Sequence, residues 1–134
     1  MSYAGDLTPA QAWAKLEEGA VLVDVRTQAE WTHIGVPETP DGQAEPLFIQ
    51  WNLAGGAANP LFLDQLRQQL PGAAATQVVF VCRSGQRSIA AAEAATGAGY
   101  TSFNVLEGFE GVPDAYGDRT VNGWKNRQLP WREG

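Results

Sequence analysis

A run of apolar residues that ends at the only cysteine of the chain constrains the fold more than any other feature. The four residues from Val78 to Val81 are apolar and of types that favour strands, which is typical of a parallel strand covered on both faces. Ser84 and Gly85 break the run and permit a tight turn. An alanine-rich segment with high helix propensity follows Arg87. The sequence therefore predicts a strand, a polar loop and a helix, with Cys82 at the carboxyl end of the strand.

The predicted position of Cys82 favours a reactive thiolate beside an anion site. In open α/β sheets, ligands bind at the carboxyl ends of the strands. The first N–H groups of a helix lack intrahelical partners and carry partial positive charge, so a loop wrapped around them forms a nest for an anion. Arg83 and Arg87 add two cationic side chains. We expect Cys82 to be ionised and nucleophilic, whereas a lone cysteine without such neighbours is more often an inert buried residue.

The remaining residues of the loop are expected to act mainly through their backbone. Ser84, Gly85, Gln86 and Ser88 would turn N–H groups towards the anion, and the Ser88 hydroxyl would also donate to the sulfur. Gly85 is expected to need a backbone conformation that other residues resist. The sequence thus predicts a substrate-binding loop over residues 83–88.

This loop and other blocks of the sequence resemble the rhodanese family of sulfurtransferases. Cys82 to Ser88 resembles the active-site loop of that family, in which Cys is followed by Arg five positions later. A match of these two residues alone is weak, but several blocks in the family's order are specific. The blocks cover nearly the whole chain: residues 22–26 with 30–31 and 33–34, residues 82–88, residues 104–109, and residues 123–125 with 129–131.

The resemblance implies both a fold and a reaction. The fold is α/β, with a central parallel sheet of about five strands and helices on both faces, and the alternation of strand and helix patterns predicts the same. The reaction is a sulfurtransferase reaction of the thiosulfate type, in which Cys82 takes a sulfane sulfur from a small anionic donor and passes it from a persulfide to a thiol or cyanide. Arg87 would brace the loop and favour the anion. No metal or organic cofactor is expected, and a protein is an alternative sulfur acceptor.

Two other functions fit the same cysteine. A cysteine-dependent phosphatase would use the thiolate on a phosphoryl group, but the related phosphatases have one more residue between Cys and Arg. The six-residue loop from Cys82 to Arg87 resembles one shaped around a sulfur atom. A non-catalytic persulfide carrier or sensor would keep the persulfide and turn over small acceptors poorly.

The composition of the chain indicates a single globular domain and argues against several kinds of binding partner and site. A chain of 134 residues with 44% hydrophobic and 18% charged residues predicts one globular domain over residues 1–134. The formal net charge of −6 disfavours general binding to nucleic acid or to anionic membranes. A single cysteine excludes an internal disulfide, a cysteine zinc cluster and an internal resolving thiol. Residues 1–6 lack a signal-peptide pattern and no stretch is long and apolar enough to span a bilayer, so we expect a cytoplasmic protein.

Several charged and aromatic residues are expected to be structural. Asp24 and Arg26 lie at a strand end, where an ion pair or loop brace is the favoured role, and Arg26 is also spaced to pair with Glu30. Arg87 would pair with a carboxylate such as Asp24. Arg83 would line the mouth of the site, and the single histidine, His33, is not expected to act in catalysis. Core packing is expected for most of the aromatic residues Trp31, Trp51, Phe109 and Trp124.

The elements are expected at positions that turn and capping residues mark. A helix should begin after Thr8, with Pro9 at its first position and Gln11 completing a capping box, and should end near residue 18. Asn59 should cap a second long helix. The other predictions are strands at residues 3–6, 21–25, 47–49 and 103–106, a short turn or helix at 27–31, loops at 36–45 and 52–58, irregular structure at 108–123 and a short helix at 122–127.

Overall fold

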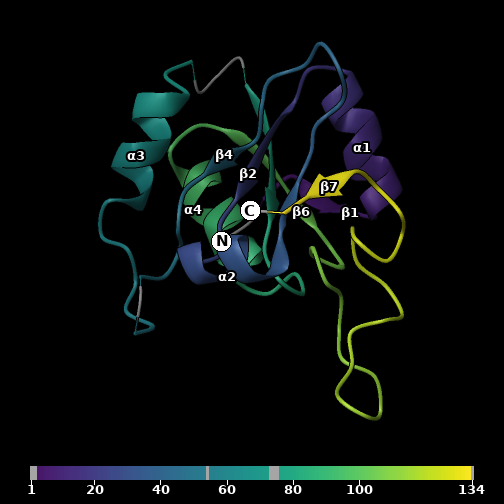
Figure 1. The fold of residues 1–134 in the computed structure, drawn as a ribbon. Helices are drawn as coiled ribbons and strands as arrows, with labels where there is room; N and C mark the ends of the chain where they lie inside the picture. The colour runs from purple at the N-terminus through teal and green to yellow at the C-terminus, as the bar shows by residue number, and fades with distance from the viewer. Residues whose placement is uncertain (1–2, 54, 73–75, 134) are drawn as a thin grey trace.

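The computed structural model describes residues 3–53, 55–72 and 76–133, and it contains a twisted sheet between layers of helices (Figure 1). Within these residues, five strands form the sheet in the order β1-β6-β5-β2-β4, and neighbouring strands are parallel. The predicted α/β fold with a central parallel sheet is therefore confirmed. The strands are β1 (Gly5–Leu7), β2 (Val21–Asp24), β4 (Leu47–Phe48), β5 (Gln77–Val81) and β6 (Thr101–Val105).

Helices cover both faces of this sheet. In Figure 1, α1 lies on one side of the strands, and α3 and α4 lie on the other. No helix of the described residues is long and apolar enough to cross a membrane. The helices are α1 (Pro9–Glu17), α2 (Gln28–Ile34), α3 (Phe62–Gln69) and α4 (Arg87–Gly97).

The central strand β5 shows why both faces are covered. Successive side chains of a strand point to opposite faces. Val78 and Phe80 join the apolar cluster of α3 and α4, whereas Val79 and Val81 join the cluster that contains α1 and Trp124. All of these side chains are fully buried. The uninterrupted apolar run is therefore what a strand between two helical layers requires.

Capping boxes fix the starts of α1 and α2. The Thr8 hydroxyl accepts from the backbone N–H of Gln11, and the Gln11 side chain accepts from the backbone N–H of Thr8, as predicted. Thr27 and Glu30 form the same reciprocal pair at the start of α2. We predicted only a short turn or helix there, but the helix continues to Ile34.

The start of α3 differs from the prediction. Asn59 does not cap the helix, which begins at Phe62 after an N-cap residue that makes no side-chain hydrogen bond. Instead, the Asn59 side-chain oxygen accepts from the Leu61 backbone N–H, and its amide nitrogen donates to the Gln50 carbonyl. Asn59 therefore builds the turn before the helix and ties that turn to the segment after β4.

The predicted helix at residues 122–127 is wrong, because this segment consists of turns. Gly123 has a φ of +98°, which is incompatible with a right-handed helix. The backbone N–H groups of Trp124 and Lys125 donate to the carbonyls of Gly108 and Phe109. These backbone hydrogen bonds hold the segment against the part of the chain that follows β6.

A small antiparallel pair lies outside the main sheet and was not predicted. It joins β3 (Val36–Pro37), inside the predicted loop at 36–45, to β7 (Trp131–Arg132). Gly35 precedes β3 with a φ of +111°, and a Cβ there would lie 2.8 Å from the Trp131 ring. Close contact with that ring therefore requires glycine at this position.

The register of the sheet brings several strand ends together at one edge. Asp24 of β2 is paired with Val81 of β5, and Phe80 of β5 is paired with Asn104 of β6. The carboxyl ends of β2, β5 and β6 therefore lie side by side, with Cys82 following the central one. This is the edge at which open α/β sheets bind ligands.

Candidate active site

The loop that follows β5 places the thiol of Cys82 at the start of α4. The loop covers residues 82–86, and Arg87 is the first residue of the helix. Gln86 is the N-cap residue, and its side chain makes no capping hydrogen bond. The first-turn N–H groups of α4 are therefore not capped by this side chain, which suits the proposed nest.

The sulfur of Cys82 has polar neighbours although its residue is almost fully buried. The residue is 1% exposed, and part of it contributes to the apolar cluster under α4. The backbone N–H of Gly85 donates to Sγ at 3.2 Å, and the Ser88 hydroxyl lies 3.1 Å from Sγ. The loop therefore supplies a backbone hydrogen-bond donor to the Cys82 sulfur.

The first two carbonyl groups of the loop accept hydrogen bonds from the chain that follows β6. The Cys82 carbonyl accepts from the Phe109 N–H at 2.7 Å, and the Arg83 carbonyl accepts from the N–H groups of Glu110 and Gly111 at 2.9 and 3.2 Å. The chain after β6 therefore holds the outer side of the loop. With these carbonyls bound outside, the peptide units can turn N–H groups towards the inside, as the Gly85 N–H does.

Gly85 is required by both its backbone conformation and its surroundings. Its φ of +98° lies in the region that residues with a side chain rarely adopt. A Cβ at this position would also overlap the carbonyl oxygen of Leu106. The prediction that this position needs an unusual conformation is confirmed.

A chain of hydrogen-bonded polar side chains runs from the buried sulfur to Asp6, an exposed residue of the edge strand β1. Ser88 donates to the Asn104 side-chain oxygen, and the Asn104 amide nitrogen donates to Asp6 at 3.0 Å. Because a hydroxyl has one hydrogen, this arrangement leaves the Cys82 thiol as the donor to Ser88. Ser88 donates to the sulfur only when it releases Asn104. Asn104 and Asp6 were not predicted as site residues, although a polar asparagine between apolar residues of a strand was a usable signal.

Arg87 pairs with Glu30 rather than with Asp24. Its two terminal nitrogens donate to the two Glu30 carboxylate oxygens at 2.7 and 2.9 Å. Burial opposes ionisation of Glu30, but the hydrogen bonds from Arg87 and Thr27 prevail and lower its pKa to about 2. The same pairing raises the pKa of Arg87, against a smaller opposite effect of burial. The expected brace is therefore present, and it joins the loop to α2.

Asp24 and Arg26 form a fully buried ion pair. The guanidinium donates to the Asp24 carboxylate through Nε at 3.0 Å and through a terminal nitrogen at 2.7 Å, and that same nitrogen also donates to the Gly35 carbonyl. The guanidinium lies 4.3 Å from the centre of the Phe109 ring. The structural ion pair that we expected is observed, whereas the alternative pairing of Arg26 with Glu30 is not.

Arg83, which was predicted to line the mouth of the site, forms an ion pair with Glu110. Its Nε lies 3.0 Å from a carboxylate oxygen of Glu110, and its side chain is 46% exposed. Arg83 and Glu110 line a pocket of about 200 Å³ together with Glu30 and His33. His33 therefore lies beside the arginine, and among the hydrogen bonds of the described residues none joins it to Cys82.

The aromatic residues mainly pack the core, as expected. Phe109 and Trp124 are fully buried. Trp31 makes an edge-to-face contact with Phe48, and Trp51 makes one with Phe62. Among the described residues, no group of three or more His, Cys, Asp or Glu side chains could hold a metal ion.

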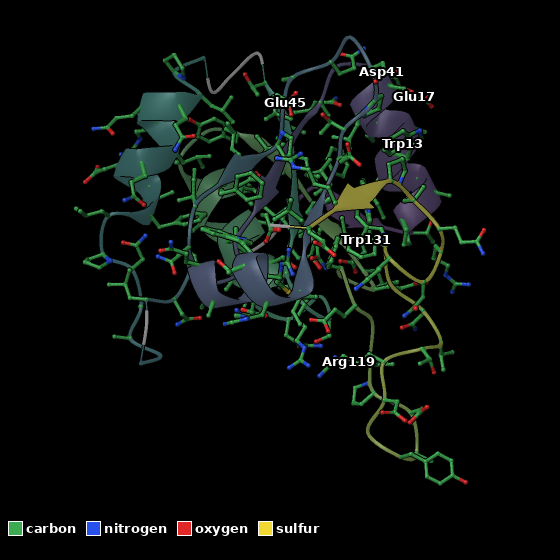
Figure 2. The ribbon with its side chains drawn as sticks, viewed as in Figure 1. Trp13, Glu17, Asp41, Glu45, Arg119 and Trp131 are labelled. Carbon is green, nitrogen blue, oxygen red and sulfur yellow. The ribbon has the colours of Figure 1, made fainter. Side chains whose placement is uncertain are left out.

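The segment at residues 111–122 projects from the body of the fold on the side of the Cys82 loop (Figure 1). Figure 2 shows Arg119 where this segment leaves the body, and the Arg119 side chain donates to the Gly111 carbonyl. The side chains of Val112, Tyr116 and Val121 are largely exposed along it. The irregular structure predicted here is confirmed, since the segment contains no helix or strand in the described residues.

Known proteins match this chain over most of its length. The sequence model of the family described as Rhodanese-like domain matches residues 8–112. The uncharacterized RP600 homolog of Rickettsia rickettsii is 36% identical over 116 residues, which are 86% of this chain and 85% of that protein. Uncharacterized RC0915 of Rickettsia conorii is 35% identical over the same share of each chain.

Solved structures agree with this match. The crystal structure of Rv0390 from M. tuberculosis has a TM-score of 0.91 and 49% identity, and it covers 99% of this chain and 100% of that one. A Rhodanese-like Domain Protein from Staphylococcus aureus has a TM-score of 0.54 and 23% identity, with coverage of 89% and 97%. This second likeness concerns the fold alone.

Proposed function

This chain belongs to the rhodanese-like domain family, and from that premise we propose that it is a sulfurtransferase that carries a sulfane sulfur on Cys82. The family supports a sulfurtransferase-type or related function. The observation that carries the proposal is the loop at the end of β5, where the Gly85 N–H donates to the Cys82 sulfur at the start of α4. We propose that this arrangement makes the thiolate nucleophilic and that loop N–H groups stabilise an added sulfur.

The proposed donor reaction uses the Cys82 thiolate as the nucleophile. The thiolate attacks the outer sulfur of thiosulfate, the bond between the two thiosulfate sulfurs breaks, and its electron pair leaves with sulfite. The product is a Cys82 persulfide, whose negative charge the loop N–H groups and the start of α4 would stabilise. A thiol or cyanide then takes the outer sulfur and returns the thiolate, so the cycle needs no metal or organic cofactor.

A reducing cytoplasm is the setting we propose for this cycle. Thiols are kept reduced there, so an acceptor thiol would be available for each persulfide formed. The chain has one cysteine and therefore cannot discharge its own persulfide.

Intact-mass spectrometry with and without thiosulfate tests the proposed function directly. We expect the mass to increase by one sulfur atom after thiosulfate, and the increase to disappear after a thiol is added, because the persulfide is a covalent intermediate. Incubation with an aryl phosphate serves as the control and should leave the mass unchanged. An added phosphoryl group instead of sulfur would favour the phosphatase alternative, and no adduct from either reagent would refute the proposal.

We propose that Arg83 attracts the anionic donor. The donor and the Glu110 carboxylate would then compete for the Arg83 guanidinium. Replacing Arg83 with alanine should raise KM for thiosulfate about three- to tenfold, because an exposed charge contributes about 1 kcal/mol. Glu110→Gln should lower this KM, since it removes the competing carboxylate from the ion pair. Steady-state kinetics at low and high salt would measure both effects, which should shrink at high salt.

The control for this pair of variants is Arg127→Ala. Arg127 forms a similar exposed ion pair with Glu107, also at 3.0 Å. Its loss should leave KM for thiosulfate unchanged. If Arg83→Ala changed KM equally for thiosulfate and for an uncharged persulfide donor, the proposed role of its charge would be wrong.

A further inference from the structure

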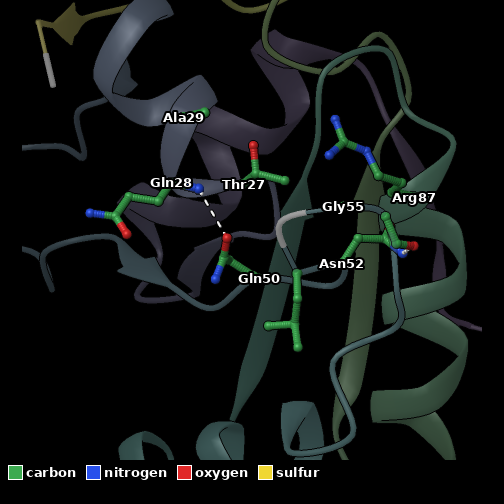
Figure 3. Close-up of a pocket in the computed structure, with 9 residues that line it drawn as sticks. Thr27, Gln28, Ala29, Gln50, Asn52, Gly55 and Arg87 are labelled. Carbon is green, nitrogen blue, oxygen red and sulfur yellow. Dashed lines mark hydrogen bonds between the residues drawn. The ribbon is translucent and has the colours of Figure 1, made fainter.

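An open pocket of about 830 Å³ lies beside the Cys82 loop and has no role in the donor reaction (Figure 3). It lies between the start of α2 and the segment after β4, and Arg87 lines it from the side of α4. Its volume is within the range of pockets that hold small molecules. The pocket therefore joins the proposed reaction centre through a residue of the active-site loop.

Side-chain amides with fixed orientations line this pocket. The Gln50 side-chain oxygen accepts from the Gln28 backbone N–H at 3.0 Å, as the dashed line in Figure 3 shows. The Asn52 side-chain nitrogen donates to the Gly56 carbonyl at 3.1 Å. Each amide thus has one end bound, which leaves the Gln50 nitrogen as a donor and the Asn52 oxygen as an acceptor. Such a pair is complementary to amide or hydroxyl groups.

The charge of the pocket does not suit a strongly anionic ligand. Arg87 is the charged residue in its lining, and its positive charge is balanced by Glu30. The pair uses two of the five N–H donors of the guanidinium, so Arg87 still has donors for a carbonyl or a single carboxylate. The pocket therefore matches a polar molecule with few charges better than it matches a compact dianion such as thiosulfate.

Arg87 also connects the pocket with the sulfur. Negative charge on Cys82 contributes to the raised pKa of Arg87, after the larger effects of Glu30 and burial. Arg87 therefore lines the pocket from the first residue of the helix that follows the Cys82 loop. A molecule bound against Arg87 would lie beside that loop.

We propose that this pocket binds the sulfur acceptor, a low-molecular-weight thiol that carries amide or hydroxyl groups. The inference rests on the proposed function and names the acceptor class for it. The acceptor thiol attacks the outer sulfur of the Cys82 persulfide, and the bond between Sγ and the outer sulfur breaks, with its electron pair going to Sγ. The outer sulfur leaves as the persulfide of the acceptor. The acceptor's thiol proton passes to solvent or to Cys82, so no oxidant or reductant is consumed.

Kinetics of pocket variants with different acceptors test the proposal. In Gln50→Leu and Asn52→Leu, we expect KM to rise about three- to tenfold for glutathione, which has amides, or for 1-thioglucose, which has hydroxyls, because a hydrogen bond to the acceptor is lost. KM for cyanide and for 2-mercaptoethanol should change less than about twofold, since these acceptors are too small to use the pocket. The two polar thiols separate a peptide-like acceptor from a sugar-like one.

A binding experiment keeps this test independent of turnover. Titration calorimetry would measure S-methylglutathione and methyl 1-thioglucoside, which cannot accept sulfur, against the wild-type chain and against each variant. Gln68→Leu, on the exposed surface of α3, is the matched control and should change nothing. Thermal unfolding would verify that the variants fold.

The outcomes separate this inference from the proposed function. Weaker binding or a higher KM in the pocket variants, for either polar thiol, supports the acceptor site. Unchanged binding and KM for both polar thiols would overturn it, even if the Cys82 persulfide forms. If no persulfide forms in the mass experiment, the sulfurtransferase proposal fails, and so does the assignment of the pocket to an acceptor.

Discussion

Replacing Cys82 with serine should abolish the formation of thiocyanate from thiosulfate and cyanide, with a loss on the order of 10³-fold or more. A hydroxyl is a far weaker nucleophile than a thiolate at neutral pH and cannot form a persulfide. The serine oxygen keeps the contacts with the Gly85 N–H and the Ser88 hydroxyl that the sulfur makes. The change therefore removes the chemistry and not the fold. Steady-state kinetics and intact-mass spectrometry would measure the loss.

Thermal unfolding of the variant serves as the control, because it shows whether the loss of activity reflects a loss of the fold. Cys82→Ser should unfold within a few degrees of the wild-type chain, because the change is nearly isosteric and the polar neighbours remain. Measurable thiocyanate formation by the folded variant would contradict the mechanism, since the chain has no other cysteine to accept the sulfur.

Replacing Arg26 with methionine should cost about 3–5 kcal/mol of the free energy of unfolding. Methionine approximates the length of the arginine stem but leaves the Asp24 carboxylate buried without its partner. It also removes the donor to the Gly35 carbonyl and the cation from the Phe109 ring. Denaturation in urea would measure the loss from the midpoint and the slope of the transition.

Other variants isolate the buried charge as the cause. Asp24→Asn combined with Arg26→Met should recover part of the loss, because no net charge then remains buried. Arg67→Met, at an exposed position of α3, is the matched control and should change stability by less than about 0.5 kcal/mol. If Arg26→Met cost no more than Arg67→Met, the ion pair would not be a major source of stability. If Arg26→Met does not fold, Arg26→Lys should still show an intermediate loss.

Much of the fold could be predicted because its signals are local. The β5 run, the Thr8 capping box and the alanine-rich segment each specify an element through contacts within a few residues. The need for Gly85 was also visible, since a tight turn leaves few alternatives. Predictions from weaker local signals were wrong where contacts with distant residues took the same hydrogen-bonding groups. Asn59 has the chemistry of a cap, but Gln50 and Leu61 take its hydrogen bonds instead.

Not all partners of charged residues could be predicted in the same way. The ion pair of Asp24 with Arg26 was expected from their position at a strand end, and it is observed. The suggested pairing of Arg87 with Asp24 is absent, because Arg87 pairs with Glu30 of α2 instead. Arg83 is paired with Glu110 only because the chain after β6 lies against the Cys82 loop. Antiparallel β3 and β7 are two residues each, too short for a recognisable pattern, and they pair across most of the chain.

The sequence by itself determined that a lone cysteine follows a buried strand and precedes a helix, because periodicity and turn residues act over neighbouring positions. It also carried the blocks that resemble the rhodanese family. Only the tertiary structure decided which carboxylates pair with Arg83 and Arg87, how Asn104 and Asp6 extend the hydrogen bonds from the sulfur, and where a polar pocket adjoins Arg87. These features depend on strand order and register, which bring distant residues together, so no local pattern specifies them.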